Sequence, residues 1–66
     1  MEHYNLMPMD NFNEEVVAKC GSLFPFINTK SSAIKYAKSV KHHFPNVHFQ
    51  LTKGETWGSQ ELVQEF

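Results

Sequence analysis

The sequence is short of the residues that stabilise secreted domains and of the apolar runs that cross membranes. It contains one cysteine, Cys20, so an intramolecular disulfide is excluded. No apolar stretch approaches the roughly 20 residues that a membrane-spanning helix needs, and no charged leader followed by an apolar run marks a signal peptide. We therefore expect a cytoplasmic protein with no membrane partner.

Motifs for catalysis and for cofactor binding are also lacking. Gly21, Gly54 and Gly58 do not form a phosphate-binding loop. No Ser-His-Asp or Cys-His-Asp set can be placed, and the carboxylates cluster in segments that we expect to be exposed. Cys20 is interpreted as a small core residue rather than a nucleophile. We expect no catalytic residue, no cofactor and no enzymatic activity.

The histidines do not have the spacing of a metal site. His42 and His43, with His48 a few residues on, look like a ligand cluster, but adjacent residues on a helix point about 100° apart. His-x3-His and Cys-x2-Cys pairs are absent from the sequence. Imidazoles in the last turn of a helix interact favourably with its negative end. We therefore predict no metal site and a structural role for His42 and His43.

The composition indicates one small globular domain spanning residues 1–66. The chain has 66 residues, of which 41% are hydrophobic, 14% aromatic and 20% charged. These proportions fit a folded core and argue against disorder. A chain of this length buries only about 60% of the surface that its unfolded form exposes, so its stability margin is small.

The stretch from Phe24 to Leu51 has the pattern of a β-α-β unit: a short aromatic run, a capped helix, a Pro-Asn turn and a strand. Asn28 or Thr29 can cap the helix through a side-chain oxygen. Pro45 ends it, because a proline ring disfavours helical geometry in the preceding residue. The apolar residues that recur at the spacing of one helical face are Ala33, Ile34, Ala37, Val40 and Phe44, with Tyr36 and His43 on the border. In the strand that follows, the apolar residues Val47, Phe49 and Leu51 alternate with His48, Gln50 and Thr52.

The segment before this unit predicts an edge strand and a short helix. Residues 3–9 are apolar enough for an edge strand that Pro8 would close, because proline cannot donate to a sheet ladder. We interpret residues 11–20 as a helix capped by Asp10 or Asn11 and stopped by Gly21. Its apolar face consists of Phe12, Val16, Val17 and Cys20. The alternative is a strand over residues 15–20 that pairs with residues 22–26.

The C-terminal segment predicts a hairpin. The residues Lys53-Gly54-Glu55 indicate a tight turn, after which the chain would return through Thr56 and Trp57. Residues 61–66 fit either a strand or a helix. Together these elements predict an α+β fold in which one main helix covers one face of a small three- or four-stranded sheet, with a second short helix near the N-terminus.

The charges are distributed in blocks. Residues 30–54 hold five lysines and no acid, whereas the segments on either side are acidic. A basic helix face through Lys35, Lys38 and Lys41 would make the chain a nucleic-acid-binding accessory protein, because clustered lysines neutralise phosphates and release counterions. The absence of arginine and the net charge of -1 weigh against this alternative.

Aromatic residues favour a protein partner instead. A fold with one main helix on a small sheet cannot bury every aromatic side chain, and we expect Tyr4, Trp57 and Phe66, with Phe26, to stay at the surface. Tryptophan and tyrosine are enriched among interface hot spots. The alternative is that these rings complete a thin core.

In size and layout the whole chain resembles phage- or plasmid-encoded proteins that bind and inhibit a host enzyme, although no diagnostic motif carries the resemblance. It implies a small non-enzymatic protein-binding domain, either an inhibitor or an accessory subunit. The partner is then another protein, and a second copy in a homodimer is one such partner.

Overall fold

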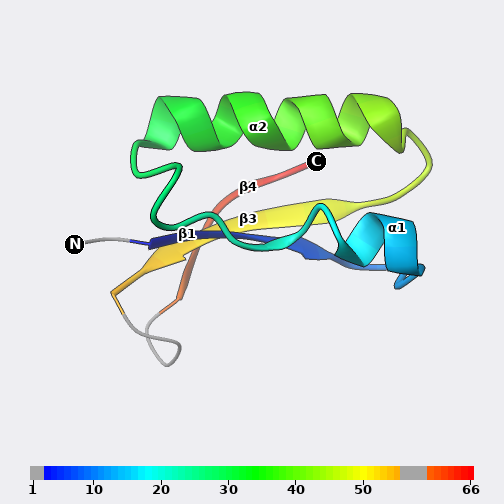
Figure 1. The fold of residues 1–66 in the computed structure, drawn as a ribbon, viewed down its shortest axis with the longest axis horizontal. Helices are drawn as coiled ribbons and strands as arrows, with labels where there is room; N and C mark the ends of the chain where they lie inside the picture. Colours follow the sequence, from blue (N-terminus) through cyan, green and yellow to red (C-terminus); the bar gives the residue numbers. More distant parts are fainter. Residues whose placement is uncertain (1–2, 56–59) are drawn as a thin grey trace.

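The computed structural model describes residues 3–55 and 60–66, which form an α+β domain of two layers (Figure 1). Four strands make one antiparallel sheet in the order β2-β1-β3-β4. The strands are β1 (His3–Pro8), β2 (Gly21–Ser22), β3 (Phe49–Gly54) and β4 (Glu61–Glu65). The main helix, α2 (Lys30–His43), lies across one face of the sheet, and the short helix α1 (Glu14–Val17) lies at one end. The predicted fold class is confirmed.

Helix α2 forms where the apolar periodicity places it. Thr29, one of the two predicted caps, accepts a hydrogen bond from the Ser32 backbone N–H through its Oγ1 at 3.3 Å. Basic side chains occupy the last turn, where they oppose the negative end of the helix dipole. The helix ends at His43, two residues before Pro45. On the predicted face, Ala33, Ala37 and Val40 are buried, and Ile34, Tyr36 and Phe44 are half-buried against the core.

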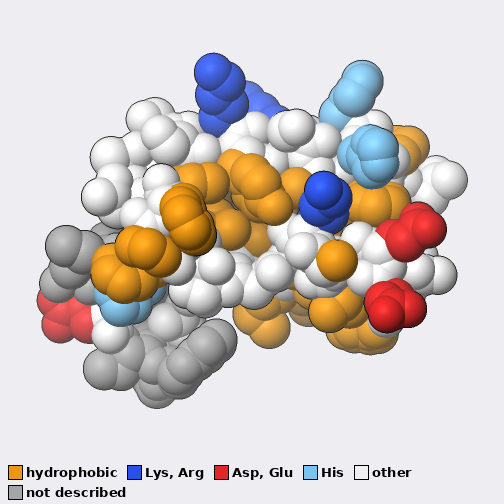
Figure 2. Space-filling view, viewed as in Figure 1, with side chains coloured by type: hydrophobic (Ala, Val, Ile, Leu, Met, Phe, Trp, Pro, Cys, Tyr) orange, Lys and Arg blue, Asp and Glu red, His pale blue; other side chains and the backbone are white. Residues whose placement is uncertain are grey.

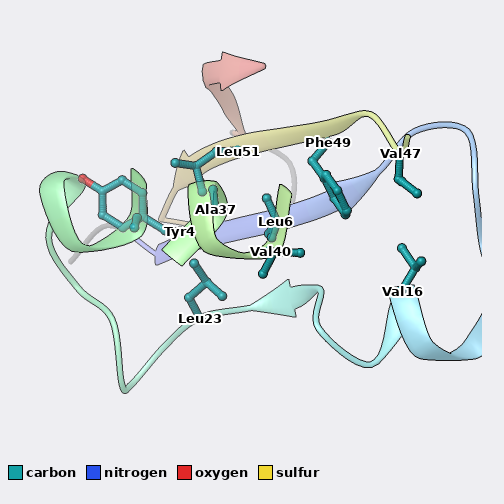
Figure 3. Packing of buried hydrophobic residues seen from close by; sticks show 10 residues of the cluster. Tyr4, Leu6, Val16, Leu23, Ala37, Val40, Val47, Phe49 and Leu51 are labelled. Atoms are coloured by element: carbon teal, nitrogen blue, oxygen red, sulfur yellow. The ribbon is translucent and has the colours of Figure 1, made fainter. Parts of the chain in front are cut away.

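The core lies between this helix face and the facing side of strands β1 and β3. Leu6 and Leu51 are register partners on the two strands and are fully buried, as is Phe49. Figure 3 shows these side chains gathered close to Ala37 and Val40 of α2. The small alanine side chains let the helix approach the sheet closely. The predicted alternation in β3 is confirmed for its buried side.

The opposite face of the sheet has a buried polar cluster that the alternation does not predict. Thr52 was expected on a solvated face but is only 8% exposed. Its hydroxyl donates to Gln60 Oε1 at 2.9 Å, and Asn5 Nδ2 donates to the same oxygen at 2.9 Å. Asn5 and Thr52 are register partners on neighbouring strands, so one glutamine side chain satisfies both.

The N-terminal segment forms the predicted strand and helix, but the position of the strand in the sheet and the length of the helix differ from the prediction. Strand β1 is an inner strand paired with both β2 and β3, not an edge strand. Helix α1 covers only Glu14–Val17, and its cap is Asn13, whose Oδ1 accepts from the Glu15 N–H at 3.0 Å. Asp10 instead accepts from the His48 N–H at the start of β3. The apolar face predicted for this helix is only partly buried: Val16 is buried and Cys20 half-buried, whereas Phe12 and Val17 are exposed.

Two further predictions differ from the structure: the aromatic run as the first strand of the β-α-β unit, and the tight turn at residues 53–55. The aromatic run Phe24–Phe26 is a turn, and the first strand of the β-α-β unit is β2, which Gly21 begins at a φ of +108°. Strand β3 continues through Gly54, so the tight turn expected at residues 53–55 is wrong. Residues 61–65, left open between strand and helix, form β4. The predicted return through Thr56 and Trp57 lies outside the described residues.

Candidate functional site

The four aromatic residues predicted for a partner surface have four different outcomes. Tyr4 is 5% exposed and belongs to the core, so the expectation that its ring stays at the surface is wrong. Phe66 is half-buried and is held to Phe49 by two backbone hydrogen bonds of 2.9 and 2.8 Å. Trp57 lies outside the described part of the chain. Phe26 remains as the aromatic side chain that the structure places fully in solvent.

Phe26 belongs to a turn that we call the aromatic turn, residues 24–26. Phe26 is 93% exposed, and Phe24 is 40% exposed. The Phe24 ring stacks on His3 with a centroid separation of 4.2 Å and an interplanar angle of 27°. In Figure 2 apolar side chains form a patch at this end of the molecule, next to a histidine. The aromatic turn therefore presents apolar surface that the domain itself does not cover.

The turn is anchored on both sides by core residues. Leu23 is buried, and its N–H donates to the Tyr4 carbonyl at 2.9 Å. The Ile27 N–H donates to the Leu23 carbonyl at 2.8 Å, and the Ile27 side chain packs against the core. These bonds hold the ends of the turn close together, so the aromatic turn is displayed on a fixed base.

The sequence pattern placed Phe24 in the run that opens the β-α-β unit and did not identify it as part of a surface. Leu23 takes the core position, and because successive side chains leave the chain in different directions, Phe24 and Phe26 cannot both follow it inward. A signal was available in the sequence. Proline between two phenylalanines favours a turn, and rings on a turn are difficult to bury.

Other large apolar side chains are exposed at the far end of β1, on and around α1. Phe12 is 70% exposed, the highest value after Phe26 among the exposed large apolar residues. The remaining members of this group are Met7, Met9 and Val17. They lie on different elements from the aromatic turn and provide a natural comparison for it.

The lysines predicted for nucleic-acid contact differ in exposure and in hydrogen bonding. Lys35 and Lys38 are exposed on the outer side of α2. Lys41 is half-buried, and its Nζ donates to the Val47 carbonyl at 2.7 Å. That hydrogen bond joins the end of the helix to the segment leading into β3, so Lys41 has a structural partner.

A shallow groove of about 280 Å³ runs along the C-terminal half of α2. The residues that line it are Lys19, Tyr36, Ser39, Val40, His42, His43 and Phe44. The Tyr36 hydroxyl donates to the Lys19 carbonyl at 2.8 Å and so joins the helix to the turn before β2. Partial burial, followed by the nearby Cys20, raises the pKa of Tyr36, and burial raises the pKa of the Cys20 thiol.

A second cluster of titratable groups joins the end of β1 to the start of β3. The Asp10 carboxylate accepts from the His48 N–H at 3.0 Å and contacts His48 Nδ1 at 2.5 Å. These hydrogen bonds, the backbone one first, lower the pKa of Asp10. Among the residues that the structure describes, no group of three or more His, Cys, Asp or Glu side chains could hold a metal ion.

No helix within residues 3–55 and 60–66 combines the length and apolar character needed to cross a bilayer. Comparisons with known proteins found no matching family model, no matching curated protein and no matching solved structure. Two surfaces of this domain stand out: the aromatic turn, with exposed Phe24 and Phe26, and the outer side of α2, with exposed Lys35 and Lys38.

Proposed function

We propose that this chain is a small non-enzymatic protein-binding domain and that the aromatic turn is its contact surface. The observation that carries the proposal is the exposure of Phe26, at 93%, on a turn whose two flanking residues are fixed in the core. Single exposed apolar side chains are common. Here, however, two phenylalanines and a proline occupy adjacent positions on one anchored turn, which favours a docking role.

The energetics favour recognition of an apolar pocket. Transferring a fully exposed phenylalanine ring into a partner stabilises a complex by about 1.5 to 3 kcal/mol. Because Leu23 and Ile27 already hold the ends of the turn, little backbone entropy is lost on binding. The partner we propose is a protein with an apolar pocket that receives Phe26 and a neighbouring surface that covers Phe24.

The wider setting follows from the same proposal. Such a domain acts as an inhibitor of a host enzyme, of phage or plasmid type, or as an accessory subunit of a larger assembly. We place it in the cytoplasm, where the single free thiol, Cys20, stays reduced. A second copy of the chain is one form that the protein partner can take.

Capture of partners from the native cell tests the proposal. Wild-type protein, Phe26→Ser and Phe12→Ser are immobilised at equal density, and retained proteins are identified by mass spectrometry. Phe12→Ser is the matched control, because it removes a similarly exposed ring at the other end of the domain. We expect a partner that wild type and Phe12→Ser retain and that Phe26→Ser binds at least about tenfold more weakly, with melting temperatures within about 2 °C.

Two results would contradict the proposal. One is equal retention of every partner by the Phe26→Ser and wild-type proteins. The other is an equal loss of partner retention in Phe26→Ser and Phe12→Ser, which would indicate non-specific hydrophobic adsorption. Sedimentation velocity on the same three proteins shows whether the partner is a second copy.

Nucleic-acid binding through Lys35, Lys38 and Lys41 is the second candidate, supported by the exposure of Lys35 and Lys38 on the outer side of α2. If it is correct, replacing all three lysines with glutamine abolishes binding and flattens its salt dependence. Replacing only Lys35 and Lys38 should have nearly the same effect, because Lys41 is bonded to Val47. A sub-micromolar affinity for DNA or RNA at physiological salt would place this candidate first.

A further inference from the structure

The groove beside α2 has a lining that the protein-binding proposal does not use. Three of its side chains are basic, namely Lys19, His42 and His43, and Ser39 adds a hydroxyl. No carboxylate is among the described residues that line it. An opening in which basic and hydroxyl groups gather without an acid suits a negatively charged ligand.

Residues on one face of α2 line the groove together with Lys19, which a hydrogen bond from Tyr36 joins to the helix. Tyr36, Ser39, Val40 and His43 recur at intervals of three and four residues, so they share one helical face. Lys19 comes from a different element and is held across the groove because its carbonyl accepts from the Tyr36 hydroxyl. Residues of the helix and of the turn before β2 therefore line the same groove.

The hydrogen-bonding capacity of the lining points to a ligand rich in acceptors. The Tyr36 hydroxyl already donates to Lys19, which leaves the Lys19 ammonium, the Ser39 hydroxyl and the imidazole N–H groups as donors. Val40 and Phe44 supply an apolar wall, and Phe44 packs edge-on against the His43 ring at 4.9 Å and 83°. The volume of about 280 Å³ lies near the lower end for small-molecule sites.

We propose that this groove binds a phosphate monoester that carries an aromatic or apolar group, such as a nucleoside monophosphate. The phosphate oxygens accept from Lys19, Ser39 and His43, and the attached group contacts Phe44. A terminal phosphate fits better than a continuous phosphate backbone, because the described lining holds a single lysine. The site is separate from the aromatic turn.

The acidic residues closest in sequence to Lys19 are Glu14 and Glu15 of α1, both exposed. In Figure 2 acidic side chains lie close to histidine side chains at one end of the molecule. Carboxylates near the groove oppose anion binding. Replacing Glu14 and Glu15 with glutamine should therefore tighten phosphate binding about twofold to threefold, which tests the electrostatic part of the proposal.

The direct test is an amide NMR titration of the full chain at constant ionic strength. The probes are inorganic phosphate, adenosine monophosphate and a short single-stranded oligonucleotide. We expect adenosine monophosphate to bind more tightly than inorganic phosphate, with the largest shifts at Tyr36, Ser39 and His43. Lys19→Gln should weaken binding at least about tenfold. Lys30→Gln, which makes the same charge change in the first turn of α2, should change it less than twofold.

The remaining outcomes decide the proposal as well. If Lys19→Gln and Lys30→Gln weaken the binding of adenosine monophosphate equally, net charge alone explains the effect and the proposed site is wrong. Tighter binding of the oligonucleotide per phosphate would overturn the monoester in favour of a polymer. If Lys19→Gln fails to fold, His43→Gln applies the same test at an exposed residue. Phe26→Ser should bind phosphate as wild type does, so failure here and failure of the partner proposal are distinguishable.

Discussion

At the scale of single residues, burial separates two side chains that the sequence pattern treats alike. Phe49 is fully buried at the centre of β3, whereas Ile34 is half-buried at the border of the helix face. Both were expected to be core residues, because periodicity identifies a face and does not grade positions within it. The difference in burial should appear directly in stability.

We expect Phe49→Ala to lower the free energy of unfolding by about 3 to 5 kcal/mol. Ile34→Ala should cost about 1 to 2 kcal/mol, because much of its area is already in water. Against a typical total of about 5 to 15 kcal/mol, the first change leaves a small domain close to unfolding. Urea denaturation measures both values, and equal costs would mean that α2 is rotated relative to the sheet.

Asp10 gives a prediction on pH. Hydrogen bonds from His48 lower the pKa of Asp10 in the folded state, so folding favours the ionised carboxylate. The resulting stability is present above the ordinary aspartate pKa of about 3.9 and is lost as the pH falls through the lower folded value. Asp10→Asn should therefore melt below wild type at pH 7, and the difference should narrow as the pH falls below the ordinary aspartate pKa. A gap that stays constant with pH, in melts recorded across this range, would show that the charge of Asp10 contributes nothing.

At the scale of elements, helix capping distinguishes two neighbouring residues that the sequence leaves open. Thr29 provides the cap of α2, and Asn28 is exposed next to it. We expect Thr29→Ala to lower stability by about 1 kcal/mol and Asn28→Ala to have little effect. Thermal melts of the two variants check this, and a larger loss for Asn28→Ala would place the start of the helix one residue earlier.

The predictable elements are those whose signal is local. The period of Ala33, Ala37 and Val40 and the alternation of Val47, Phe49 and Leu51 lie within α2 and the segment that ends in β3, and both were predicted correctly. Strand β2 has two residues and no period of its own. Its place beside β1 depends on pairing between residues far apart in the sequence. Such pairing also makes β1 an inner strand.

The candidate sites divide in the same way. The exposed lysines of α2 follow from helix geometry and were predicted. The aromatic turn was missed, because its exposure depends on Leu23 filling the core before Phe24 can. The groove was missed for a related reason. Lys19 is joined to the helix by the hydrogen bond from Tyr36, and the spacing of residues in the sequence does not predict that contact.

At the scale of the whole molecule, a single helix can cover only one face of the sheet. At the centre of the other face, Asn5 and Thr52 donate hydrogen bonds to Gln60, and these polar side chains stand where a second apolar layer would otherwise lie. The proposed contact surfaces therefore lie beyond the two layers, at a turn and beside the helix. The outer edge of β4 is a further surface, because no described strand pairs with it.

That edge carries features that oppose pairing with a second copy. The register shift between Leu51 and Thr52 leaves Val63 as an extra residue in β4, which interrupts the ladder. A two-fold antiparallel pairing of β4 about Val63 would place each Glu61 opposite a Glu65. Like charges directly opposite one another destabilise a strand pair.

We therefore expect the combined change of Glu61→Gln and Glu65→Gln to strengthen self-association. Removing two repulsive pairs should favour the dimer by about 1 kcal/mol, which is roughly a fivefold lower dissociation constant. Sedimentation velocity over a range of concentrations measures it. Glu14→Gln with Glu15→Gln is the matched control, because it makes the same charge change on α1, away from the sheet edge. If both double variants associate equally, net charge rather than the edge of β4 keeps the copies apart; if only the β4 variant associates, the acidic residues of this strand protect the sheet edge.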